Sequence, residues 1–245
     1  MFSPLEQFDI FKLIILKISN FDISIFNIIL PFIIINILFF FFIKFLKRNS
    51  KLISDIIQNI LELLYKFVFN IVIQQLGNKG LNYFHLIFII FNFIFFSNLL
   101  SLVPFGIAIT SHVILIFFLS FTICISIFII GLITHYLEFL KIFIPQSPLI
   151  LLIILIPIEI FSYLIRMFSL AIRLAANILA GHTLVHIIST FVLNLTFIKW
   201  WLIFVVSIPL LMIISLELGI AFLQAYVFTI LICIYLSDSL NGPLH

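Results

Sequence analysis

The chain has 245 residues, of which 65% are hydrophobic and only 9% are charged, and its formal net charge is +3. With a mean hydropathy of +1.43, it carries more apolar side chain than a soluble fold can bury, which excludes a soluble globular protein and predicts an all-α, polytopic membrane protein. The positive charge is small and scattered, so nucleic acid is not expected as a partner.

The N-terminal region predicts one membrane span without a cleavable signal. Residues 1–22 mix acidic and basic side chains and lack a small-residue cleavage site, so we expect synthesis inside the organelle or cell that uses the protein. The first span is predicted at about 23–45. A basic cluster follows it at once: Lys44, Lys47, Arg48 and Lys51. This cluster places the end of the span on the cytoplasmic or matrix side, and the N-terminus on the opposite side.

Residues 52–75 differ from the spans because polar residues interrupt apolar ones at helical spacing. This pattern predicts an amphipathic helix on the membrane surface. Two upright spans are then predicted at 83–103 and 111–136. In the first of these, Ser97 and Asn98 are expected to form hydrogen bonds between helices.

The last two apolar segments, 149–194 and 200–236, are too long to stand upright. At a rise of ~1.5 Å per residue they would be ~69 and ~55 Å long, against a hydrocarbon core of ~30 Å. Either they break into short spans or they form a long, tilted, near-horizontal helix hairpin. Their ionisable residues favour the tilted hairpin, because such groups at membrane depth have to face protein or water. We expect one membrane domain over 1–245.

Arg173 is the most informative residue of the hairpin. Arginine stays charged, and an arginine at the bilayer centre costs ~2.5–3.5 kcal/mol on insertion scales. It could form a structural ion pair within a helix bundle, or it could be functional. Asn177 lies one turn later on the same face. Small residues surround the pair and let another helix come close: Ala175, Ala176, Ala180 and Gly181. This favours a partner that carries the opposite charge.

Further polar residues of the hairpin include Glu159, Arg166, His182, His186, Glu217 and Gln224. By helical phase Glu159 projects near the Arg173 face, ~21 Å away along the axis, and His182 projects to the opposite side. Glu217 and Gln224 are seven residues apart and share a face. Such a pattern could carry protons along two paths separated by a positive charge. His182 and His186, one turn apart, could instead bind Zn²⁺, although two ligands are incomplete.

The segment 172–182, IRLAANILAGH, resembles the signature of the subunit a family of F-type ATP synthases, in its mitochondrial form. Four further segments resemble the family in the same order: 97–104, 110–113, 158–163 and 223–228. The resemblance runs from about residue 90 to the C-terminus, and the first 90 residues resemble the family only in layout. One departure is Ala176, where many relatives have phenylalanine.

The resemblance implies a stator subunit beside a ring of c subunits, each with one membrane carboxylate, and two offset proton half-channels. It implies that Arg173 is the essential arginine, with Asn177 and Gln224 as polar neighbours. Glu159 would serve the half-channel facing the matrix, and His182 with Glu217 the half-channel facing the intermembrane space. The implied partners are the c-ring, the peripheral stalk, other membrane-sector subunits and lipid such as cardiolipin, in the mitochondrial inner membrane.

No cofactor is expected, and no glycine-rich phosphate loop predicts an ATP site in the chain itself. The alternative function is a proton- or ion-conducting subunit of another respiratory membrane complex. Antiporter-like pumps use a lysine and a glutamate in separate broken helices, and a cytochrome b uses histidine pairs about thirteen residues apart. The hairpin has no such buried lysine, and the six histidines are not spaced in that way.

Overall fold

The computed structural model of the chain describes residues 12–14, 17–18, 21–22, 25–27, 29–48, 56–102, 110, 112–136, 139, 148–196 and 201–241. It divides into two compact units. The first unit comprises Met1–Ser50, Asn92–His112 and Leu174–Ala225. The second unit comprises Lys51–Phe91, Val113–Arg173 and Tyr226–His245. Three helices therefore contribute residues to both units.

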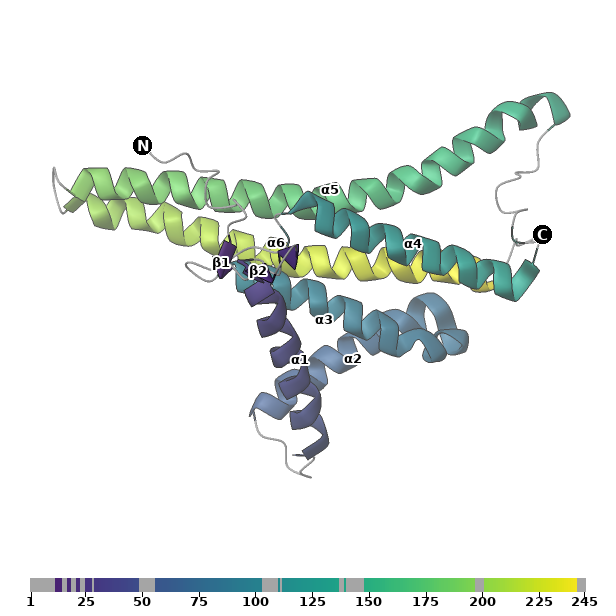
Figure 1. The fold of residues 1–245 in the computed structure, drawn as a ribbon, viewed down its shortest axis with the longest axis horizontal. Coiled ribbons are helices and arrows are strands. Elements are labelled where there is room, and N and C mark those ends of the chain that lie inside the picture. Colours follow the sequence, from purple (N-terminus) through teal and green to yellow (C-terminus); the bar gives the residue numbers. More distant parts are fainter. Residues whose placement is uncertain are drawn as a thin grey trace. The chain divides into compact units, whose positions relative to one another are not determined.

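The described elements are mostly helical (Figure 1). They are α1 (Ile29–Arg48), α2 (Ile56–Leu76), the 3-10 helix η2 (Gly77–Tyr83), α3 (Phe84–Ser101), α4 (Val113–His135), α5 (Leu149–Thr196) and α6 (Trp201–Asn241). Four stretches are long and apolar enough to cross a membrane: Gln58–Ser101, Val113–His135, Leu151–Phe191 and Ser207–Asn241. The prediction of a helical, multi-pass membrane protein is confirmed.

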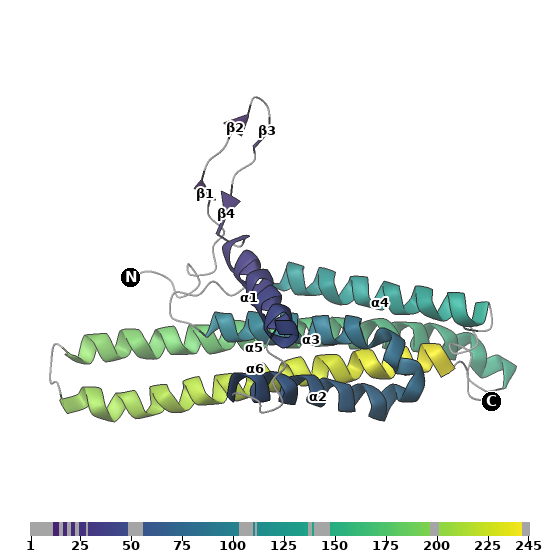
Figure 2. The ribbon, with the colours of Figure 1, turned by 90° about the horizontal axis from the view of Figure 1, so that it is seen from below.

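Four short strands precede α1 and were not expected from the sequence. In Figure 2 they form a narrow ribbon that leads into α1. Strand β1 (Lys12–Ile14) pairs with β4 (Ile25–Phe26), and β2 (Lys17–Ile18) pairs with β3 (Phe21–Asp22), both antiparallel. Isoleucine and phenylalanine favour extended backbone, and two residues with turn propensity, Ser19 and Asn20, separate β2 from β3 in the sequence.

In the first unit, the second half of α5 and the first half of α6 lie side by side (Figures 1 and 2). The buried side of α5 consists of Leu174, Ala175 and Ile178, at helical spacing. The last part of α3 also packs on α6, where the Phe95 and Phe222 ring centroids are 5.9 Å apart. Gly181 of α5 faces α6 and, having no side chain, lets the two backbones approach closely.

In the second unit, aromatic side chains join α2 to the start of α3. The Tyr65 ring lies edge-on to Phe84 and Phe88, with centroids 5.0 and 5.6 Å away. The first half of α5 meets the end of α6 at Tyr163 and Tyr235, whose ring centroids are 5.4 Å apart. The hydroxyls of α4 at Ser120, Thr122 and Ser126 bond to carbonyls of their own helix.

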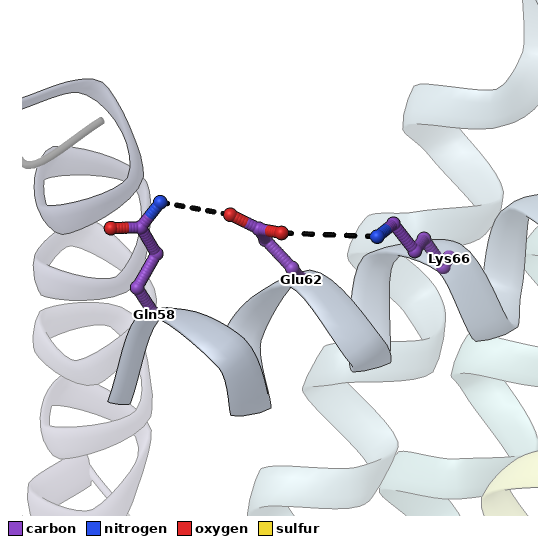
Figure 3. Close-up of polar contacts among 3 residues, drawn as sticks. All are labelled: Gln58, Glu62 and Lys66. Carbon is purple, nitrogen blue, oxygen red and sulfur yellow. Dashed lines mark hydrogen bonds and ion pairs between the residues drawn. The ribbon is translucent and has the colours of Figure 1, made fainter. Parts of the chain in front are cut away.

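The predicted amphipathic helix corresponds to α2, which carries a polar row at four-residue spacing (Figure 3). Gln58 donates to a Glu62 oxygen at 2.8 Å, and the Lys66 amine lies 3.8 Å from the other oxygen of Glu62. The ion pair is solvent-exposed and contributes little, about 0–1 kcal/mol. Exposed Ile56 and Leu63 also lie on α2. Because the apolar stretch Gln58–Ser101 includes α2, its placement on the membrane surface stays a prediction.

Candidate functional site

Arg173 lies on the exposed side of α5. Ala176 and Ala180 follow it by three and seven residues, which places all three on one face of the helix, and both alanines are exposed. We call this set the Arg173 face. Within the described part of the chain, Arg173 forms no ion pair or hydrogen bond. A structural ion pair inside the bundle, the simpler of the two interpretations, therefore has no support among the described residues.

The four small residues near Arg173 serve two different surfaces. Ala175 is buried, with 1% of its surface exposed, and Gly181 contacts α6. Ala176 and Ala180 instead belong to the Arg173 face. The small residues of α5 thus have two roles. Ala175 and Gly181 pack inside the chain, whereas Ala176 and Ala180 are exposed on the face that carries the charge of Arg173.

Glu217 of α6 packs directly on the backbone of Gly181 in the first unit. A Cβ atom placed on Gly181 would lie 2.5 Å from Glu217 Oε1 and 2.8 Å from its Cδ. Glu217 is only 6% exposed, and Oε1 has no hydrogen-bond partner among the residues that the structure describes. His182, the residue after Gly181, is half-buried. The structure thus brings Glu217 to the turn of α5 that carries His182.

A strip of buried polar side chains runs along α6 on the same side as Glu217. Gln224 lies two turns further and is 7% exposed, as its seven-residue spacing predicts. Between them, the Asn98 amide of α3 donates to the Ala221 carbonyl at 3.3 Å. The Asn98 Oδ1 atom is buried and has no partner in the described ranges. Buried oxygens that lack a hydrogen-bond partner in the protein are normally bonded to ordered water. This strip is therefore suited to hold water.

The prediction for the two polar residues of α3 is half confirmed. Asn98 bonds between helices, as expected. The prediction for Ser97 is wrong, because its hydroxyl donates at 2.9 Å to the Ile94 carbonyl of its own helix. A serine three residues after a carbonyl reaches it more easily than it reaches another helix.

Glu159 lies in the second unit, where it is half-buried. Tyr163 follows it by one turn of α5 and contacts Tyr235 of α6, as described above. The Tyr163 hydroxyl also forms a hydrogen bond with the Cys124 thiol. Asp238, an exposed carboxylate, comes three residues after Tyr235. The sequence alone did not point to Tyr163, Tyr235 or Asp238 as members of this group, although the four-residue spacing from Glu159 to Tyr163 was a usable signal.

Asn177 and His186 are both half-buried in α5. No group of three or more histidine, cysteine or acidic side chains within reach of one metal ion occurs among the described residues. The zinc site at His182 and His186 therefore stays a two-ligand prediction. The side chain of Arg166, for which a structural role is the simpler interpretation, lies outside the described part.

Comparison with protein families gives a match that spans most of the chain. The model of the family described as ATP synthase A chain matches residues 26–237. The chain belongs to this family. As an ATP synthase A chain, it is a proton-translocating subunit of the membrane sector of F-type ATP synthase.

The match also includes much of the first 90 residues, which resemble the family only in layout. It begins at the end of β4 and includes all of α1 and α2. Helices α1 and α2 are therefore parts of the ATP synthase A chain itself, not additions to it.

Proposed function

We propose that this ATP synthase A chain is the stator subunit that forms two offset proton half-channels against a ring of c subunits, with Arg173 between them. The observation that carries the proposal is the Arg173 face. It presents a permanent charge on an exposed helix surface, flanked by alanines and without a partner among the described side chains. A membrane-embedded charge in this position needs an opposite charge beside it, and a ring carboxylate supplies one.

Protons are taken up through the first unit. A proton passes Glu217 and His182, with Gln224 further along the same strip, and neutralises the ring carboxylate. The burial of Glu217 beside Gly181 and the unpaired oxygens along the strip support this role, because a proton path needs water next to a group that can bind the proton. Once neutral, the ring site can move into lipid at low cost.

Protons are released through the second unit. The ring carboxylate that arrives at Arg173 is held ionised and has given its proton toward Glu159. Tyr163, Tyr235 and Asp238 continue from Glu159 toward the end of α6, which supports a path on this side. Asn177, one turn after Arg173 on α5, is a polar neighbour of the arginine in this scheme.

Arg173 prevents a direct leak between the two half-channels, because a guanidinium cannot give up its proton under these conditions. Each proton that crosses 100 mV supplies ~2.3 kcal/mol, and several protons drive one turn of the ring. The location that fits this function is the mitochondrial inner membrane. The N-terminus then faces the intermembrane space, and the basic cluster at the end of α1 faces the matrix. The remaining partners are the peripheral stalk, other membrane-sector subunits and lipid such as cardiolipin.

The test is to recover the tagged chain from its native membrane in mild detergent. We expect a ring of c subunits to be recovered with it, and vesicles containing the recovered complex to conduct protons. A parallel purification from membranes that lack c subunits is the control and should yield no proton conduction. Recovery with bound haem or quinone, and without a c-ring, would contradict the proposal in favour of another respiratory complex.

A further inference from the structure

We propose that His135, the last residue of α4, is a positioning residue for proton release: it holds the end of α6 so that Asp238 keeps its place beside the Tyr163–Tyr235 contact. The inference rests on the proposed release path through Glu159. All the residues concerned belong to the second unit.

The central contact joins two helix ends. His135 Nε2 lies 3.1 Å from the carbonyl oxygen of Leu240. A carbonyl oxygen can only accept a hydrogen bond, so Nε2 is the donor. Leu240 lies in the last turn of α6, where carbonyls have no donor four residues later in the same helix. His135 thus satisfies a group that α6 cannot satisfy itself.

A second contact reaches the same turn from η2. The Lys79 amine donates to the Asn241 side-chain oxygen at 3.3 Å, and the Asn241 amide donates to the Ser237 hydroxyl at 3.1 Å. Basic side chains are favourable at a helix C-terminus, because the partial charge there is negative. The last turn of α6 is therefore held by α4 and by η2.

Asp238 lies inside this held turn, between Ser237 and Leu240. Tyr235, one turn earlier, is 3% exposed and is fixed by its contact with Tyr163. Helix ends fray when their terminal groups lose their partners. Without the bond from His135, this turn is held only by the contact from Lys79, so Asp238 should become less well placed while Tyr235 stays in position. The release path would then lose efficiency at its outer carboxylate, but the helix contact would remain.

Thr134 provides a matched control next to His135. Its hydroxyl is 3.4 Å from the Ser239 carbonyl, but it is closer to two carbonyls of its own helix, at 3.0 and 3.1 Å. Since a hydroxyl has one proton to donate, Thr134 bonds mainly within α4. Thr134→Val should therefore change proton release very little.

The experiment uses the complete complex in vesicles, with the pH stepped on one side at a time. His135→Leu should lower proton conduction roughly fivefold, about what one ordinary hydrogen bond contributes. The change in proton conduction should appear only when the pH is stepped on the release side. His135→Gln, which keeps a donor at similar reach, should restore most of the rate. His135→Asn, which is polar but too short, should show the defect even if the leucine variant fails to assemble.

The proposal is overturned if His135→Asn conducts normally, or if its defect responds equally to pH on both sides, as a general loss of structure would. Glu159→Gln separates this inference from the release path on which it rests. If Glu159→Gln leaves the release-side response unchanged, the release path is wrong. If Glu159→Gln abolishes that response while His135→Asn preserves it, only the positioning role fails.

Discussion

Gly181→Ala should disable proton translocation through one added methyl group. The new Cβ would lie 2.5 Å from Glu217 Oε1, 2.8 Å from Cδ and 3.2 Å from Cγ. Carbon and oxygen do not pack closer than about 3.0 Å, so the carboxylate has to move by at least about half an ångström, or the two helices have to separate.

Two opposing terms set the effect of Gly181→Ala on stability. Overpacking of this kind costs about 1–3 kcal/mol, and the higher helix propensity of alanine offsets about 1 kcal/mol. The net destabilisation is therefore about 0–2 kcal/mol, small enough for the complex to assemble. The effect on proton transfer should be larger, because a displacement approaching 1 Å can lower a rate by about 100-fold.

The assay measures proton conduction by the assembled complex in vesicles, normalised to the amount of complex. Gly219→Ala in α6 is the matched control, because a Cβ at Gly219 would meet nothing within 4 Å. We expect Gly181→Ala to lose about 10- to 100-fold and Gly219→Ala to retain the wild-type rate. Glu217→Asp, which shortens the side chain by one methylene, should recover part of the rate when combined with Gly181→Ala. If Gly181→Ala conducts as well as Gly219→Ala, the packing of Glu217 on Gly181 does not matter for translocation.

Arg173→Gln should abolish coupled proton pumping while the complex still assembles, and Arg173→Lys should also fail because an ammonium can lose its proton. ATP-driven pumping by either variant at the wild-type rate would refute the role of the arginine. Exchanging the proposed uptake pair, His182→Glu with Glu217→His, should recover more pumping than the worse single variant, since coupled groups share their titration; a double-mutant cycle on the pumping rate decides this. If His182 and His186 bind a metal, micromolar zinc should inhibit pumping from the uptake side only, and His186→Ala should relieve the inhibition. Equal inhibition of the wild type and of His186→Ala would exclude the site.

The helical elements were predictable from sequence because membrane helices depend on apolar length. The two long segments expected at 149–194 and 200–236 correspond to α5 at Leu149–Thr196 and α6 at Trp201–Asn241. The shared face of Glu217 and Gln224 also followed from spacing alone, because a helix fixes the phase of its own side chains.

Contacts between helices could not be predicted in the same way. The sequence showed that Gly181 thins α5, but not that a carboxylate would occupy the space. Nor did it show that Ala175 and Ala176, neighbours in the chain, would serve a buried and an exposed surface. The Tyr163–Tyr235 contact and the held end of α6 depend on tertiary geometry as well, and spacing along one helix carries no information about a partner 72 residues away.

The bond between Asn98 and Ala221 can form only late in the synthesis of the chain. The two residues are 123 positions apart. At a synthesis rate of about 5–20 residues per second, Ala221 is added roughly 6–25 s after Asn98. During that interval the Asn98 amide of α3 lies in the membrane without its final hydrogen-bond partner. Lipid tails cannot replace this partner, because they form no hydrogen bonds. The Asn98 amide therefore has to wait for α6, and chains truncated before Ala221 should be degraded faster than the full-length chain.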